Sequence, residues 1–391
     1  MLHLPGCRAC WDLGVRVVAE LKSEGRLAPS IAAAHEIVDL LEQKQARALH
    51  WLLVRCQGAE LARLPFHEQR DRIEANPELR TLEMFSALAD EAASASLEDP
   101  HLGEEAAFVA HALVDALPGD LCPEPLRNDL RAEALMIVAN CRRMAGDWRG
   151  SAAALATARG HLLRGTGKPT REARLLSIQA SLAMDTGRLE QALELLGRSS
   201  ELYGKAQDTE AAMSVTVQEA STLLAACRHV EAIARAEEAL SELTPKDARL
   251  EMLARNIITA SLVFLGRPED ALLSFRATQR LYQQLQGKRA EFQAGYLMAL
   301  LLDAQDHVRE AEKAFRKNIA DRMEAEHYKD AFLTLVDFLQ SLVRRGAFDK
   351  AARACEEALE MIERAGSACH TQMIELWRSL LDLINARRLT D

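Results

Sequence analysis

Apolar residues recur at helical spacing along most of the chain, and short polar turns interrupt them at regular intervals. Six such turns are centred on residues 146, 187, 227, 266, 306 and 346, so they recur every 39–41 residues. The clearest copies begin at Gly187, Gly266 and Gly346. A fixed period of this length predicts a repeat architecture in which each unit is one supersecondary element.

Each period predicts a helix, a tight turn and a second helix from about Leu126 onward. Around the turn at 187, Leu176, Ala180 and Ala183 mark the apolar face of the first helix. Ala192 and Leu196 mark that of the second. We find no strand pattern, so the sequence predicts an all-α protein.

A small residue follows five positions after every turn. Two antiparallel helices approach closely only where the side chain between them is short. We therefore predict that these six side chains lie at the helix–helix contact of their units: Ser151, Ala192, Ala232, Ala271, Ala311 and Ala351.

These features together resemble the tetratricopeptide repeat. Shared positions are the turn glycine, small residues in the first helix and apolar residues after the turn; they include Ala139, Ala180, Ala220, Ala299, Trp148, Leu189, Phe348, Leu155, Leu196, Phe275 and Phe315. The family's period is about 34 residues, so units near 40 look like the extended variant of bacterial regulators and signalling scaffolds. The resemblance covers residues 126–386. It implies a right-handed superhelical solenoid of antiparallel helix pairs.

The residues before the repeats predict a helical N-terminal region. Helices are expected over 11–21, 29–56, 77–95 and 102–117, and a tract rich in Pro and Gly at 118–125 ends the region. We divide the chain into a Cys/His head with the first helix (1–25), a helical capping region (26–125) and a solenoid of about six units (126–391).

The charge and composition of the chain limit the classes of partner that it is expected to bind. The formal net charge of −10 argues against direct nucleic-acid binding, because such surfaces cluster Lys and Arg. No signal peptide or membrane span is visible. The eight cysteines are scattered, which fits a reducing cytoplasm, and we expect Cys141, Cys227 and Cys355 to be small core residues.

No catalytic motif is present in the sequence. The tract Arg164-Gly165-Thr166-Gly167-Lys168-Pro169 superficially resembles a phosphate-binding loop, but no strand precedes it, so we predict a connection between units. Nucleophile elbows and His-Glu-x-x-His helices are absent. We therefore predict a protein without enzymatic activity and, in the solenoid, without a cofactor.

One segment has the spacing of metal ligands. His3, Cys7 and Cys10 form the pattern H-x3-C-x2-C, in which two thiolates and an imidazole can occupy three corners of a zinc tetrahedron. The pattern is similar to the zinc-binding module of bacterial anti-sigma factors, whose fourth ligand comes from an upstream helix. The alternative is a terminal segment whose cysteines have no specific role.

A second candidate site follows from the repeat resemblance, which implies that the first helix of each unit lines the concave face. Carried over by position, this selects Asn140, Arg143, Arg174, Ser177, Ser181, Asn256, Tyr296, Asp303 and Gln340. Such side chains can hydrogen-bond an extended peptide. Alternatively, they are ordinary exposed helix residues, or the apolar positions between them pack against the chain's own N-terminal helices.

The sequence thus favours a scaffold or regulatory adaptor that binds a protein or peptide. Two alternatives remain open. One is an anti-sigma-like transcriptional regulator whose head contacts a sigma factor, and the other is a regulatory subunit that binds the effector enzyme of a protease or defence complex.

Overall fold

A computed structural model describes residues 66–388, except 98, 243–246, 286 and 366–370, together with 54, 57, 58, 60, 61 and 64. The expected helices over 11–21 and 29–56 and the whole segment 1–25 lie outside the described residues. Within them are sixteen α-helices, one 3-10 turn (Pro77–Leu79) and no strand.

The helices follow one another in a single series. The N-terminal ones are α3 (Phe66–Ala75), α4 (Leu82–Ala95) and α5 (Pro100–Ala116). Next come α6 (Glu124–Met144), α7 (Trp148–Leu162), α8 (Pro169–Asp185), α9 (Leu189–Lys205), α10 (Thr209–Ala225), α11 (His229–Glu242) and α12 (Ala248–Phe264). The last are α13 (Pro268–Leu285), α14 (Lys288–Ala304), α15 (Val308–Glu324), α16 (Tyr328–Arg344), α17 (Phe348–Ala365) and α18 (Thr371–Arg388).

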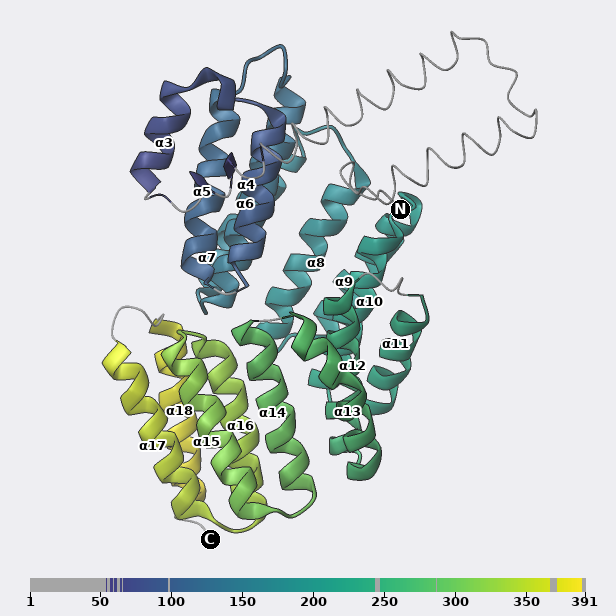
Figure 1. The fold of residues 1–391 in the computed structure, drawn as a ribbon, viewed down its shortest axis with the longest axis vertical. Coiled ribbons are helices and arrows are strands. Elements are labelled where there is room, and N and C mark those ends of the chain that lie inside the picture. Colours follow the sequence, from purple (N-terminus) through teal and green to yellow (C-terminus); the bar gives the residue numbers. More distant parts are fainter. Residues whose placement is uncertain are drawn as a thin grey trace, which may run out of the picture.

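Six helical hairpins make up the solenoid, and we number them units 1 to 6. Each pairs a first helix (α6, α8, α10, α12, α14 or α16) with the helix that follows it, and α18 packs on the last pair. The series curves so that α14–α18 lie below α3–α7 in Figure 1. The predicted period therefore corresponds to one hairpin per unit.

All six predicted turns adopt the same backbone geometry. Residues 146, 187, 227, 266, 306 and 346 each have a positive φ, between 57° and 85°. The next residue's N–H donates to a carbonyl five positions back, as in Arg188 N to Ala183 O at 2.8 Å, which satisfies a carbonyl left free at the helix end. Cys227 and Asp306 thus occupy the position that glycine fills elsewhere.

The same turn recurs at two junctions between units. Gln207, between α9 and α10, has φ 55°, and Glu326, between α15 and α16, has φ 62°. His327 N donates to Arg322 O at 2.8 Å, the same bond that closes the turns within units. Neither site has a glycine, and neither falls in the series of turns within units that recurs about every 40 residues, so the sequence analysis did not predict them.

The predicted small residues lie where the hairpins close. Ser151 and the five alanines that follow the later turns each expose 2% or less of their surface. This confirms that they sit at the contact between the two helices of each unit, where a longer side chain would push the helices apart.

The N-terminal helices pack directly on the solenoid. One apolar core cluster runs from α4 and α5 through α6 and α7 without a break at residue 125. The predicted helix over 77–95 is divided into a 3-10 turn and α4, and the one over 102–117 begins two residues earlier, at Pro100, where Asp99 Oδ1 accepts from His101 N at 2.9 Å. The division at residue 125 remains a prediction.

The cysteines differ in environment. Cys141 and Cys355 are buried, as expected, and burial raises the pKa of these thiols to about 12 and about 11. The expectation for Cys227 is wrong: its side chain is exposed, because the residue lies in the turn between α10 and α11 and not within a helix. Among the described helices, none has the length and apolar character needed to cross a bilayer.

Candidate functional site

All nine residues predicted for the concave face lie on first helices, and we call the surface formed by these six helices the first-helix row. Asn140 and Arg143 are on α6, and Gln340 is on α16. The other six are distributed over α8 (Arg174, Ser177 and Ser181), α12 (Asn256) and α14 (Tyr296 and Asp303).

Side chains one unit apart meet along this row. Arg174 Nη1 on α8 donates to Glu133 Oε1 on α6 at 2.9 Å. Ser177 Oγ donates to Gln218 Oε1 on α10 at 2.6 Å. Neighbouring first helices therefore share one polar surface between units 1 and 3.

A similar link joins α14 to α16. The hydroxyl of Tyr296 donates to Asp337 Oδ2 at 2.7 Å, and the guanidinium of Arg322 lies 6.0 Å from the tyrosine ring centre. Burial raises the pKa of Tyr296 well above its ordinary value, and the adjacent Asp337 carboxylate raises it further. Burial also raises the pKa of Asp337. The phenol stays neutral and serves as a hydrogen-bond donor.

The Asp303 carboxylate, at the end of α14, accepts hydrogen bonds from several donors at the end of α16. Ser341 Oγ donates to it at 2.5 Å, and Arg344 and Arg345 pair with it at 3.1 and 2.6 Å. The carboxylate is nearly buried. Gln340, in contrast, is exposed, so this end of the row offers a free amide to solvent.

Asn256 points toward the second helix of its own unit. Its Oδ1 accepts from the Tyr282 hydroxyl on α13 at 2.5 Å. Its Nδ2 is buried and has no hydrogen-bond partner in the described part of the chain. On the same helix, the apolar side chains of Leu253 and Val263 are partly exposed.

A buried charged cluster lies at the junction between the end of unit 5 and the start of unit 6. Arg322 is 3% exposed, and its Nε donates to Asn318 Oδ1 at 2.8 Å while Nη1 lies 3.5 Å from Asp330 Oδ2. Burial alone would raise the pKa of Asp330, but Arg322, Lys329 and other nearby cations lower it to about 2. Asp330 is therefore ionised at neutral pH.

Arg143 contacts a carboxylate that also binds the far end of the solenoid. Its Nη1 lies 2.6 Å from Asp185 Oδ2, and its Nε and Nη2 donate to Asn140 Oδ1. Lys329 Nζ lies 3.1 Å from the same Asp185 oxygen. Although burial opposes ionisation, Lys329 and Arg143 lower the pKa of Asp185 below its ordinary value.

The tract that superficially resembled a phosphate loop connects α7 to α8, as predicted. Its Thr166 donates through N and Oγ1 to Asp129 at 3.1 and 2.5 Å, and Arg171 pairs with the same carboxylate at 3.1 Å. A side chain at Gly165 would clash with Asp129. A carboxylate of the protein itself thus satisfies these donors.

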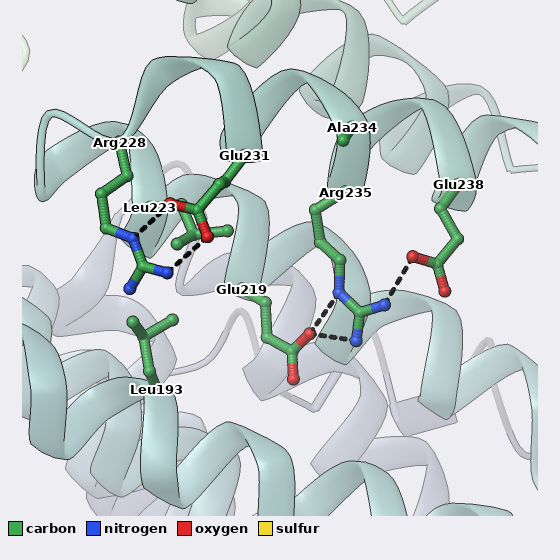
Figure 2. A pocket seen from close by; sticks show the side chains of 8 residues that line it. All are labelled: Leu193, Glu219, Leu223, Arg228, Glu231, Ala234, Arg235 and Glu238. Atoms are coloured by element: carbon green, nitrogen blue, oxygen red, sulfur yellow. Dashed lines mark hydrogen bonds and ion pairs between the residues drawn. The ribbon is translucent and has the colours of Figure 1, made fainter.

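Helices α9, α10 and α11 line a hollow of about 530 Å³ (Figure 2). In it Arg235 pairs with both Glu219 and Glu238 at 2.5 Å, and Arg228 pairs with Glu231 at 2.5 Å. Most of the lining comes from the second helices α9 and α11, and Glu219 and Leu223 come from the first helix α10. None of the nine predicted residues is among the lining residues, which are Leu193, Glu219, Leu223, Arg228, Glu231, Ala234, Arg235 and Glu238.

The zinc prediction cannot be placed on the structure, since His3, Cys7 and Cys10 lie outside the described residues. Among those that are described, no group of three His, Cys, Asp or Glu side chains is arranged to hold a metal ion.

Sequence reasoning missed several residues of the row that contact the predicted ones, among them Glu133, Gln218, Asp337, Ser341 and Arg344, as well as Asp185, which binds Arg143 and Lys329. Gln218 and Asp337 each lie 41 residues after their partners, Ser177 and Tyr296. A search one residue beyond the 40-residue period would have found them. For Asp185 and Lys329 the sequence carries no signal, because their contact depends on the curvature of the whole solenoid.

No protein-family model matches the chain, and no curated protein matches its sequence. Solved structures do share its fold. The crystal structure of aspartyl phosphate phosphatase F from Bacillus subtilis has a TM-score of 0.56 and 13% identity, covering 91% of this chain and 88% of that one. A Rap protein complexed with competence and sporulation factor has a TM-score of 0.52 and 13% identity, over 86% and 98%. The likeness confirms the predicted all-helical solenoid.

Proposed function

We propose that the protein is a non-catalytic regulator or scaffold whose first-helix row binds a protein segment or peptide. The observation that carries this proposal is the pairing of row side chains one unit apart, such as Ser177 with Gln218 and Tyr296 with Asp337. Such pairs join first helices of neighbouring units into shared surfaces, and an extended ligand that spans several units requires such surfaces.

The row combines polar and apolar groups that suit a peptide. Gln340 is exposed, and Leu333 on the same helix is 54% exposed. An exposed amide can bond a peptide main chain, while an exposed leucine can bury part of a peptide side chain. A structure with the same fold is complexed with competence and sporulation factor, which supports ligand binding by this architecture.

The other similar structure is named a phosphatase, so catalysis needs its own test. The nearly buried carboxylates of the row, Asp185 and Asp303, are each paired with two cations, and this pairing suits structural support rather than acid–base chemistry. We expect the purified protein not to accelerate hydrolysis of acetyl phosphate, a small acyl phosphate. Hydrolysis that Asp303→Asn abolishes would contradict this part of the proposal.

Neither alternative function gains support from the two similar structures. The anti-sigma alternative depends on His3, Cys7 and Cys10, and zinc there remains a proposal. Mass-spectrometric metal analysis of full-length protein would test it, because Cys7→Ser with Cys10→Ser should remove bound zinc if the motif is a site. A cytoplasmic location, which would keep these thiols reduced, is likewise a proposal.

The main experiment is capture of the partner from the native host with two matched double variants. Leu333→Glu with Gln340→Glu places charge on the row. Leu273→Glu with Val230→Glu places the same charge on second helices, at residues that are 64% and 68% exposed. Substitutions at such exposed sites change stability little, so binding can be compared between folded proteins.

We expect partners identified by mass spectrometry to be retained by the wild type and the second-helix variant and lost from the row variant. Retention by the row variant together with loss from the second-helix variant would contradict the proposal and direct attention to the outer hollow of Figure 2.

A further inference from the structure

Asp185 joins parts of the solenoid that are far apart in sequence. It is the last residue of α8 in unit 2, and its side chain is only 5% exposed. Its two oxygens lie 3.2 and 3.1 Å from Lys329 Nζ, at the start of α16 in unit 6. Arg143 of unit 1 binds the same carboxylate at 2.6 Å. Three side chains thus connect units 1, 2 and 6.

This connection differs from the other ion pairs between units. Arg174 and Glu133 are 41 residues apart, and Arg344 and Asp303 are also 41 apart, so each of these pairs joins neighbours. Asp185 and Lys329 are separated by 144 residues. Their contact therefore depends on the solenoid curving far enough to bring its last unit back to its first two.

A second observation places the two ends together. Trp148, the first residue of α7, packs against the N-terminal core cluster and also against the C-terminal cluster, which extends over α12 to α18. Figure 1 shows the same arrangement, with α14–α18 facing the lower ends of the N-terminal helices. Apolar packing and charge pairing thus occur at one seam.

We propose that Arg143, Asp185 and Lys329 form an electrostatic clasp that holds the superhelix closed at this seam, and that its release lets unit 6 move away from units 1 and 2. The clasp joins α6 and α8 to α16, which are first helices at the two ends of the row. Its state therefore sets how widely the row opens to an entering chain. The inference concerns the shape of the free protein and stands independently of the proposed function.

Of the three residues of the clasp, Lys329 is the one that can be lost while the other two stay paired. Without it, Asp185 keeps its short pair with Arg143, so no buried carboxylate is left without a cation. Without Asp185, in contrast, two nearly buried cations would face each other. Lys329 is 15% exposed and Arg143 13%, so salt in solution screens the clasp only weakly. Substitution of Lys329 therefore tests the clasp more directly than a change of ionic strength does.

The test is small-angle X-ray scattering of the full-length protein at low ionic strength. Lys329→Met removes the clasp while keeping the aliphatic side chain, and Lys329→Arg keeps the charge. The matched control is Lys317→Met on α15, which removes an ion pair with Asp321 inside one helix, where Lys317 is 73% exposed. Circular dichroism establishes that each variant retains its helices.

We expect Lys329→Met to increase the radius of gyration and the maximum dimension, with Lys329→Arg and Lys317→Met matching the wild type. A folded Lys329→Met protein with unchanged scattering would overturn the clasp. Equal expansion by Lys317→Met would also overturn it, because the effect would then follow from charge loss alone. These outcomes require no bound partner, so they are separate from the capture experiment.

Discussion

Asp129 shows how single carboxylates hold the connections between helices. It is 1% exposed in α6 and pairs with Arg171 while accepting two hydrogen bonds from Thr166. The loop between α7 and α8 therefore closes on a charge that the first unit supplies. Such a group stabilises the native state only while its partners remain in place.

We predict that Asp129→Ala lowers the free energy of unfolding by about 3 kcal/mol, because it leaves the Arg171 guanidinium and the Thr166 donors without their acceptor. Chemical denaturation monitored by circular dichroism measures the loss. Asp120→Ala, at an exposed residue of the preceding loop, should change stability by less than about 0.5 kcal/mol. Equal effects of the two substitutions would contradict the structural role of Asp129.

Asp330 should make stability depend on pH in the acid range. Its pKa is about 2 in the folded protein against 3.8 for the ordinary group, because nearby cations outweigh the effect of burial. A lowered pKa means that the stabilisation is complete above about pH 4 and is lost as pH falls toward 2. The difference between these two pKa values corresponds to about 2 kcal/mol in the free energy of unfolding.

The measurement is the free energy of unfolding of wild type and Asp330→Asn at a series of pH values. We expect the two proteins to differ most at neutral pH and to converge as the pH approaches 2. A difference that stays constant down to that pH would show that the carboxylate charge is not the source.

At the scale of elements, the hairpin turns explain why the repeat could be recognised in the sequence. Glycine at Gly187, Gly266 and Gly346 takes a left-handed conformation that other residues adopt at a cost. Cys227 and Asp306 adopt it without glycine. The repeat pattern is therefore less clear in the sequence of these units, although their turns have the same geometry. Each unit's fold depends on the hairpin contact more than on the turn residue itself.

We predict that Gly266→Ala destabilises the protein by about 1 kcal/mol and that Cys227→Gly stabilises it by about 0.5 kcal/mol. An added Cβ at Gly266 meets no neighbouring atom, so backbone conformation is the sole cause of the expected loss. Thermal unfolding of both variants measures the two signs. Stabilisation by Gly266→Ala would contradict the turn assignment.

The sequence predicted the helices and their first-helix faces because a fixed period fixes which side of each helix meets its neighbours. It placed Ser177 and Tyr296 on the row for that reason. Their partners Gln218 and Asp337 escaped notice, since the side chains that meet are 41 residues apart although their helices are offset by 40. Which of the nine predicted residues touch a partner remains a prediction.

At the scale of the whole molecule, sequence periodicity could not reveal the seam. Small rotations between successive units add up over the solenoid, and their sum decides whether Asp185 meets Lys329. Packing angles between helices vary by many degrees around their preferred values. A contact 144 residues apart therefore needs the three-dimensional structure.

The first-helix row also predicts which helices a bound partner should protect from hydrogen exchange. Helices α6, α8, α10, α12, α14 and α16 should lose exposure together, because they contribute to one surface. The hollow is lined mainly by α9 and α11, with Glu219 and Leu223 from the first helix α10, so α9 and α11 provide the internal comparison.

Hydrogen–deuterium exchange of the full-length protein, alone and with the captured partner, is the most direct test of this account. We predict slower exchange in the first helices, with little change in α11 and α13. Protection confined to α9, α11 and α13 would contradict the assignment of the first-helix row as the binding surface.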